Sequence, residues 1–222
     1  MTFPKAYHGV KKLFTARMLG LIGSVCSIIG LIIGAGAAVS LVSGESDTLA
    51  IGAGSIVFIA AGLILPIIGL IIQLVGLKQA ANDEDNFRQA FIISIFALVI
   101  TIVSSIFTAL NVGGGRADNI ATLVSGIAEI FVVIYVTQGI SNLADQLKNE
   151  DIARQSGRIA VLFTVVYAVS ILSNFVIIFF GANQTIGVIV IVLSILSAIL
   201  SFVASIIYLV YLGNAKNMLR DN

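Results

Sequence analysis

The chain contains no tryptophan, one cysteine and one histidine, and each shortage excludes a class of site. The single cysteine, Cys26, cannot form a disulfide or a cysteine-based metal site within one chain. The single histidine, His8, precedes the first long apolar run, so a Ser–His dyad or an H-E-x-x-H metal site among those runs is excluded. There is also no G-x-x-x-x-G-K-[ST] nucleotide-binding loop. We therefore expect no enzyme activity, no metal and no cofactor.

Charged residues are scarce as well, at 10% of the chain, whereas hydrophobic residues make up 59%. Soluble domains average about a quarter charged and about half apolar residues. A soluble fold of 222 residues could not bury so much apolar surface, so lipid is expected to surround most of the chain. The net charge of +1 argues against a nucleic-acid partner. The expected partner is therefore the lipid bilayer.

Six long apolar runs are present, at residues 18–43, 50–77, 90–112, 119–142, 158–181 and 185–212. Each exceeds the roughly 20 residues that an α-helix needs to cross a hydrocarbon core of about 30 Å. They predict an all-α, polytopic membrane protein with six transmembrane helices, in which residues 1–222 form a single membrane domain. The first run is longer than the apolar segment of a cleaved signal peptide, so we expect it to be retained.

Basic residues indicate the orientation of these helices. If the runs cross the membrane alternately, Arg116 lies alone on one side and the other eleven of the twelve Lys and Arg residues lie on the opposite side. By the positive-inside rule, the side rich in basic residues is cytoplasmic. Both termini are therefore expected in the cytoplasm.

A short pattern recurs where the third and fifth runs begin. Glu84–Gln89 and Glu150–Gln155 both read E-D-x-x-R-Q, at a spacing of 66 residues, and Arg17 takes the matching place before the first run. The even-numbered runs each close on a glycine: Gly76, Gly139 and Gly213. These correspondences predict three repeated antiparallel helical hairpins, at about residues 10–80, 81–147 and 148–222.

Small residues mark the faces on which these helices are expected to pack, because lipid provides no hydrophobic drive for helix association. Spacings of four and seven residues connect the candidate packing glycines: Gly30, Gly34, Gly62, Gly69 and Gly76. A spacing of seven residues predicts that the helices cross closely and with a left-handed angle. The same faces could also join two copies of the chain into a homo-oligomer, or join the chain to another membrane protein.

Hydroxyl and other small residues form similar seams in the third and sixth runs, which include Thr101 and Ser197. Close packing is the simpler explanation of these seams, and a narrow polar pore is the alternative. In the second run, Pro66 lies midway and is expected to kink the helix.

Glu129 is the one Asp, Glu, Lys, Arg or His residue that lies deep within an apolar run. Its run extends from residue 119 to residue 142, so the carboxyl group falls near the middle of the bilayer. Inserting an acid there costs about 3 kcal/mol, and the five apolar residues that follow it return about 2 kcal/mol. Like Pro66, Glu129 lies ten residues before the glycine that closes its run.

Two interpretations of Glu129 are open. In the functional one, the carboxyl group faces a polar cavity, where it carries a proton or binds a cation, as intramembrane acids often do. In the structural one, it is a neutral acid hydrogen-bonded to a neighbouring helix. The polar residues available as partners are Thr101, Ser197, Gln73 and Asn174.

Three stretches of the sequence, ARMLGLIG, GLKQAANDEDNFRQAF and GISNLADQLKNED, resemble bacterial six-span integral membrane proteins built of repeated helical hairpins. The resemblance implies a bacterial cytoplasmic membrane, but no known activity or functional residue comes with it. We therefore predict a structural, accessory or partner-binding membrane subunit. The alternative is a transporter or channel for a small solute or ion, with Glu129 at its centre.

Overall fold

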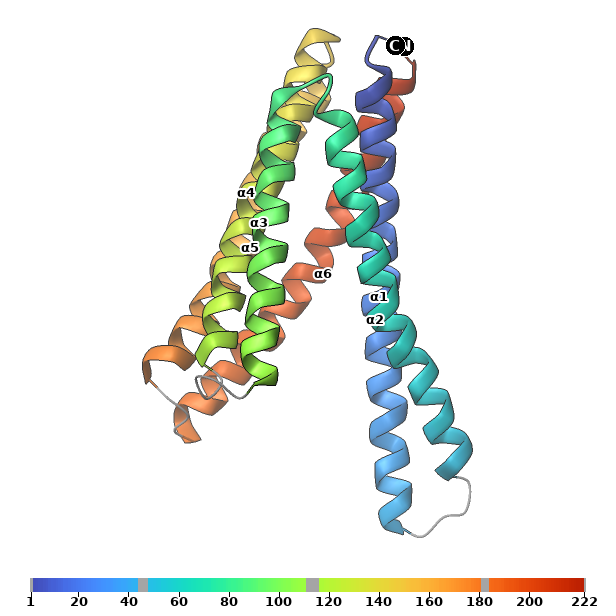
Figure 1. The fold of residues 1–222 in the computed structure, drawn as a ribbon, viewed down its shortest axis with the longest axis vertical. Coiled ribbons are helices and arrows are strands. Elements are labelled where there is room, and N and C mark those ends of the chain that lie inside the picture. Colours follow the sequence, from blue (N-terminus) through green and yellow to red (C-terminus); the bar gives the residue numbers. More distant parts are fainter. Residues whose placement is uncertain (1, 44–47, 111–115, 181–183, 222) are drawn as a thin grey trace. The chain divides into compact units, whose positions relative to one another are not determined.

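The computed structural model is helical throughout its described elements and confirms the predicted six-span, all-α fold (Figure 1). It describes residues 2–43, 48–110, 116–180 and 184–221, with the side chains of 35–43, 48–54, 108–109, 116–122, 173–174, 176–180 and 184–191 left out. The helices are α1 (Pro4–Ser43), α2 (Thr48–Ala80), α3 (Asp85–Ala109), α4 (Arg116–Gln146), α5 (Glu150–Phe180) and α6 (Gln184–Asp221). Each is long and apolar enough to cross a membrane.

The chain divides into two compact units. The larger unit comprises residues 1–11 and 76–222, and therefore holds α3 to α6 with the first turns of α1 and the last turns of α2. The smaller unit comprises residues 12–75, the remainder of α1 and α2. The single membrane domain and the threefold hairpin repeat stay predictions.

Within the larger unit, α3 and α4 form an antiparallel hairpin in a constant register. A Cβ on Gly139 would lie 2.9 Å from the ring of Phe87, and the hydroxyls of Thr101 and Ser125 are 3.2 Å apart. Both pairs are equidistant in sequence from residue 113, in the connection between the helices. The helices α4 and α5, and then α5 and α6, pack together in the same sequential way.

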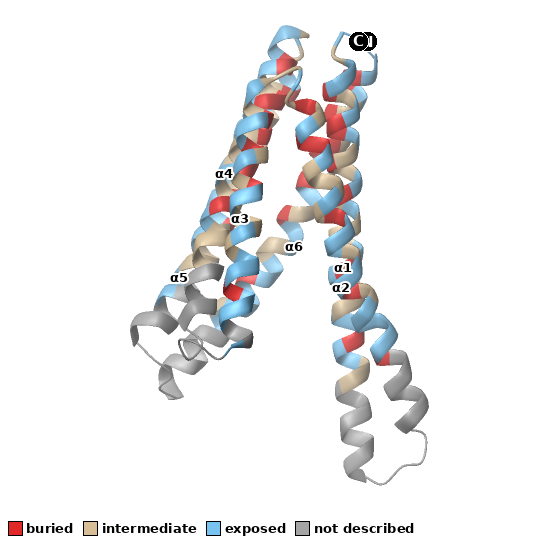
Figure 2. Ribbon diagram, viewed as in Figure 1, coloured by how far each residue is buried: buried red, intermediate tan, exposed pale blue. Residues whose placement is uncertain are grey.

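Three helices, α1, α5 and α6, extend well past their apolar runs. The helix α1 begins at Pro4 and α6 ends at Asp221, whereas the runs predicted there begin at residue 18 and end at residue 212. Hydropathy reports the part of a helix that lies in lipid, and the extensions instead bury short apolar stripes such as Ala6 with Val10 and Ala215 with Leu219. Figure 2 shows that buried residues of the larger unit gather towards the end at which α1 begins and α6 finishes.

Farther along the helices, large apolar side chains point outward. Leu31, Ile32 and Val161 are each about two-thirds exposed, at 66%, 68% and 65%. Contiguous exposure of this kind is rare on soluble monomers and is typical of a surface that contacts lipid or another protein. The exposed apolar surface therefore indicates a bilayer environment for these helices.

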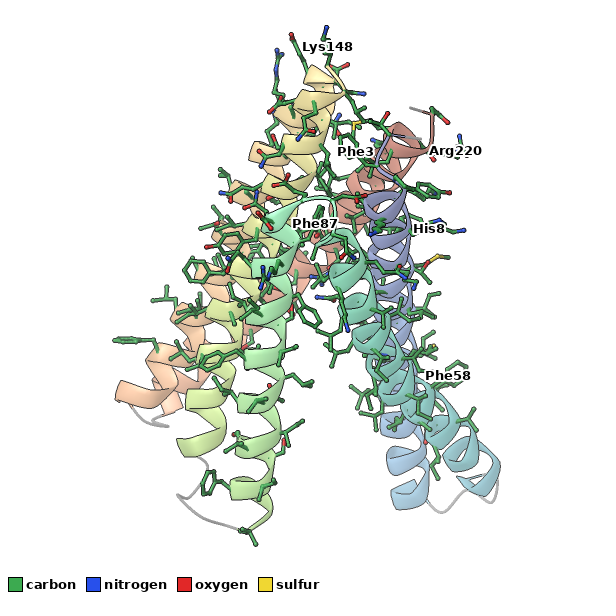
Figure 3. The ribbon with its side chains drawn as sticks, turned by 45° about the horizontal axis from the view of Figure 1, so that its top comes forward. Phe3, His8, Phe58, Phe87, Lys148 and Arg220 are labelled. Carbon is green, nitrogen blue, oxygen red and sulfur yellow. The ribbon has the colours of Figure 1, made fainter. Side chains whose placement is uncertain are left out.

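The turn between α4 and α5 combines two helix caps. The N–H of Asn149 donates to the carbonyl of Ala144 at 2.8 Å and the N–H of Lys148 donates to that of Asp145 at 3.0 Å, the paired bonds of a Schellman motif. The Asn149 side chain then accepts from the N–H of Ile152 at 3.2 Å and caps α5. Lys148, at the tip of the turn (Figure 3), has a φ of 57°, a left-handed conformation that favours glycine.

Lys148→Gly should therefore stabilise the protein by about 0.5–1 kcal/mol, because glycine adopts positive φ without a Cβ penalty. Thermal unfolding of the purified protein in detergent measures the change. Lys148→Ala is the control, since it removes the charge and keeps the strained Cβ. An equal gain in both variants would assign the effect to charge rather than to backbone conformation.

Polar contacts bring several helix ends of the larger unit together. Asp83, in the turn before α3, accepts from the N–H of Ala6 at 2.7 Å and caps α1. Glu84 accepts from the Asn142 amide at 2.9 Å, which ties the same turn to the end of α4. Nine of the twelve basic residues belong to this end of the larger unit, which we call the basic end: Lys5, Lys11, Lys78, Arg88, Lys148, Arg154, Arg158, Lys216 and Arg220.

Candidate functional site

Glu129 lies on the interior face of α4. It shares a 4-3-4 spacing with Val133, Val136 and Ile140, all of which are buried, while Phe131 and Gln138 of the opposite face are exposed. Glu129 itself is half-buried. The carboxyl group is thus directed towards neighbouring helices of the larger unit rather than towards lipid.

The hydroxyl of Tyr167 on α5 donates a hydrogen bond to Oε2 of Glu129 at 2.8 Å. Both residues are 19 positions from Lys148, the tip of the turn that joins their helices. One turn beyond them, Gly126 faces Ile171, to which a Cβ on Gly126 would lie 3.7 Å away. The small residue lets α4 and α5 approach closely at the depth where the polar pair forms.

Aromatic rings continue from this pair along α5 and α6. Phe163 lies between Tyr167, with ring centroids 6.0 Å apart, and Tyr208, at 5.1 Å in an edge-to-face arrangement. Tyr208 stacks on Tyr211 at 6.1 Å. The Tyr211 hydroxyl is 2.6 Å from that of Ser156, a buried pair between α6 and α5. We call Tyr167, Phe163, Tyr208 and Tyr211 the aromatic ladder; it connects the depth of Glu129 to the basic end.

The polar residues proposed as partners of Glu129 lie in different places. The hydroxyl of Thr101 on α3 is hydrogen-bonded to that of Ser125 on α4, which lies one turn before Glu129. Ser197 is buried on α6. Gln73 is half-buried in the smaller unit, and the side chain of Asn174 is outside the described residues. Tyr167 is the partner that sequence reasoning missed. Once the structure places Lys148 at the tip of the turn, equal counting along the two helices leads to Tyr167.

The candidate packing glycines lie at contacts between α1 and α2. A Cβ on Gly30 would lie 2.9 Å from Ile59, and one on Gly69 would lie 3.0 Å from the Ala16 carbonyl oxygen. The ring of Pro66 packs on Gly23, to which an added Cβ would be 2.7 Å from Cδ, and α2 continues through the proline as one α-helix. The remaining glycine contacts are Gly34 with Ser55, Gly62 with Ser27, and Gly76 with Gly9.

The described residues include no group of three or more histidine, cysteine, aspartate or glutamate side chains that could hold a metal ion. Comparisons with protein-family models, curated proteins and solved structures find no match. The resemblance to bacterial six-span proteins therefore stays a prediction, and the proposal of function has to come from the geometry of the chain.

Proposed function

We propose that this chain is a structural or accessory integral membrane protein of the bacterial cytoplasmic membrane, with both termini in the cytoplasm. The observation that supports it is the hydrogen bond from Tyr167 to Glu129. A carboxyl group at mid-depth is costly unless a polar partner satisfies it, and here the partner lies on the adjacent helix. The acid thus works as an interhelical tie. The basic end of the larger unit supports the orientation.

An interhelical tie at this position specifies how α4 and α5 pack. A shift of α5 by one residue would rotate Tyr167 by about 100° and move its hydroxyl away from the acid. The aromatic ladder then extends the same register to α6 through Phe163 and Tyr208. A fixed α4–α5–α6 surface is what an accessory subunit needs in order to present a constant face to a partner.

A transporter or channel for a small solute or ion is the second candidate. It is favoured by the Thr101–Ser125 hydroxyl pair, which lies one turn from Glu129 and adds polar groups at similar depth. Along the ladder, however, the Phe163 ring, which has no polar atom, lies between the rings of Tyr167 and Tyr208 and interrupts the row of hydroxyl groups. A proton relay along this route would need water.

Replacing Glu129 separates the two candidates. We expect Glu129→Gln to keep the fold, because an amide oxygen can still accept from Tyr167. Glu129→Ala and Tyr167→Phe should each destabilise by about 1–2 kcal/mol, as expected for the loss of a buried hydrogen bond. The double variant should cost less than the sum of the two single changes. Denaturant titration in detergent measures the free energy of unfolding of the native protein and of these four variants.

Proton- and cation-coupled flux in proteoliposomes completes this test. The structural proposal predicts no difference in flux between the native protein and Glu129→Gln. Flux that Glu129→Gln abolishes, in a protein of unchanged stability, would overturn the structural proposal in favour of transport. If the flux is unchanged, mass spectrometry of the proteins that copurify with the native protein, but not with Tyr167→Phe, would identify the partner.

A further inference from the structure

An exposed stripe on α5 begins with two arginines. Arg154 and Arg158, one turn apart, are both exposed and lie on the same face as Val161, Val165 and Leu172, which are 65%, 55% and 52% exposed. The buried residues Ile152, Ser156, Ile159, Phe163 and Val166 occupy the opposite face of the helix. The stripe therefore points away from the packed core of the larger unit.

The two arginines lie at the level expected for lipid headgroups. After Arg158 no Asp, Glu, Lys or Arg occurs until Lys216, so Arg158 marks the edge of the hydrocarbon core. Arg154 lies about 6 Å farther out along the helix axis. A guanidinium at each of these depths can meet a phosphate from two sides.

The acidic residues near this pair balance its charge overall, but they lie beside Arg154 and not beside Arg158. Glu150 and Asp151, in the first turn of α5, are exposed and lie within one turn of Arg154. On its own helix, Arg158 has Arg154 as its one charged neighbour at that distance. Like charges four residues apart disfavour each other, and a bound anion removes that repulsion.

Gly157 leaves an open space beside the arginines. A Cβ built on Gly157 would meet no atom within 4 Å. The stripe thus combines a cationic pair, a notch in the helix surface and an apolar track of three turns. A phospholipid has the complementary order of phosphate, glycerol and acyl chain.

We propose that Arg154, Arg158 and Gly157 form a binding site for an anionic phospholipid. The phosphate lies between the two guanidinium groups, the glycerol lies over Gly157, and one acyl chain follows Val161, Val165 and Leu172. The matching position in the third run has a single arginine, Arg88, followed one turn later by Ile92. The matching position of α3 therefore lacks the second arginine. The proposal is independent of the structural function proposed above.

Lipid binding to the purified full-length protein in detergent tests this site. The probes are phosphatidylglycerol and phosphatidylcholine with identical acyl chains, with affinities measured by native mass spectrometry. Arg154→Gln with Arg158→Gln should weaken phosphatidylglycerol binding about 30-fold, which corresponds to about 1 kcal/mol for each basic residue. Gly157→Leu should weaken it without changing any charge. Binding of phosphatidylcholine should change little.

The control variant, Lys78→Gln with Arg88→Gln, removes the same two charges from exposed positions at the ends of α2 and α3. It should leave the high-affinity phosphatidylglycerol site intact. Equal losses in the two double variants would overturn the proposal, because they would indicate general surface charge. Unchanged affinity in the α5 variants, or equal competition by free glycerol phosphate, would overturn it as well.

Discussion

Phe87→Ala should lower the free energy of unfolding by about 3–5 kcal/mol, the range for removing a buried aromatic ring from a packed core. Phe87 is fully buried at the α3–α4 contact, near the basic end (Figure 3). Its ring fills the space left open by Gly139 of α4. Alanine would therefore leave a cavity, and Gly139 has no side chain that could fill it. Equilibrium unfolding in a detergent–denaturant mixture measures the loss.

Phe96→Ala on the same helix is the matched control. Phe96 is 61% exposed, so its removal deletes contacts with lipid and leaves no cavity in the protein. We expect it to cost less than about 1 kcal/mol, since alanine also favours the helix. Similar losses in the two variants would mean that Phe87 contributes through lipid contact rather than through packing against Gly139.

Comparison of sequence and structure shows which physical signals can be read directly. The six helices were predicted because a bilayer requires about 20 apolar residues in each span, and this requirement is stronger than any local preference. The ends of α1 and α6 were predicted too short. The extra turns carry an amphipathic stripe such as Ala6 with Val10, which hydropathy averaging treats as polar sequence.

The partner of Glu129 was harder to predict. Hydroxyl residues on the small-residue seams were proposed, and Tyr167 was not, because it belongs to no such seam. The register of the α4–α5 hairpin depends on the three-residue turn capped by Asn149, with Lys148 in a left-handed conformation. A lysine gives no sequence signal for such a turn, whereas glycine would have done so. Without the turn, depth cannot be matched across the helices.

The contact between α1 and α2 near the basic end gives the other large expected effect. Gly9→Val should destabilise by about 3 kcal/mol, at the upper part of the range for overpacked contacts. A Cβ on Gly9 would lie 2.6 Å from the Gly76 carbonyl oxygen and 2.8 Å from the Ala80 nitrogen. Both are backbone atoms, so the helices must separate rather than adjust a side chain.

Gly20→Val makes the same change on the same helix where a Cβ would meet nothing within 4 Å. It should be neutral or slightly stabilising, because valine favours a helix more than glycine does. If the two variants unfold alike, the close approach of Gly9 to Gly76 does not hold the hairpin together. If Gly9→Val alone is destabilised, Gly76 acts as an internal packing residue, and a homo-oligomer would need to use another face.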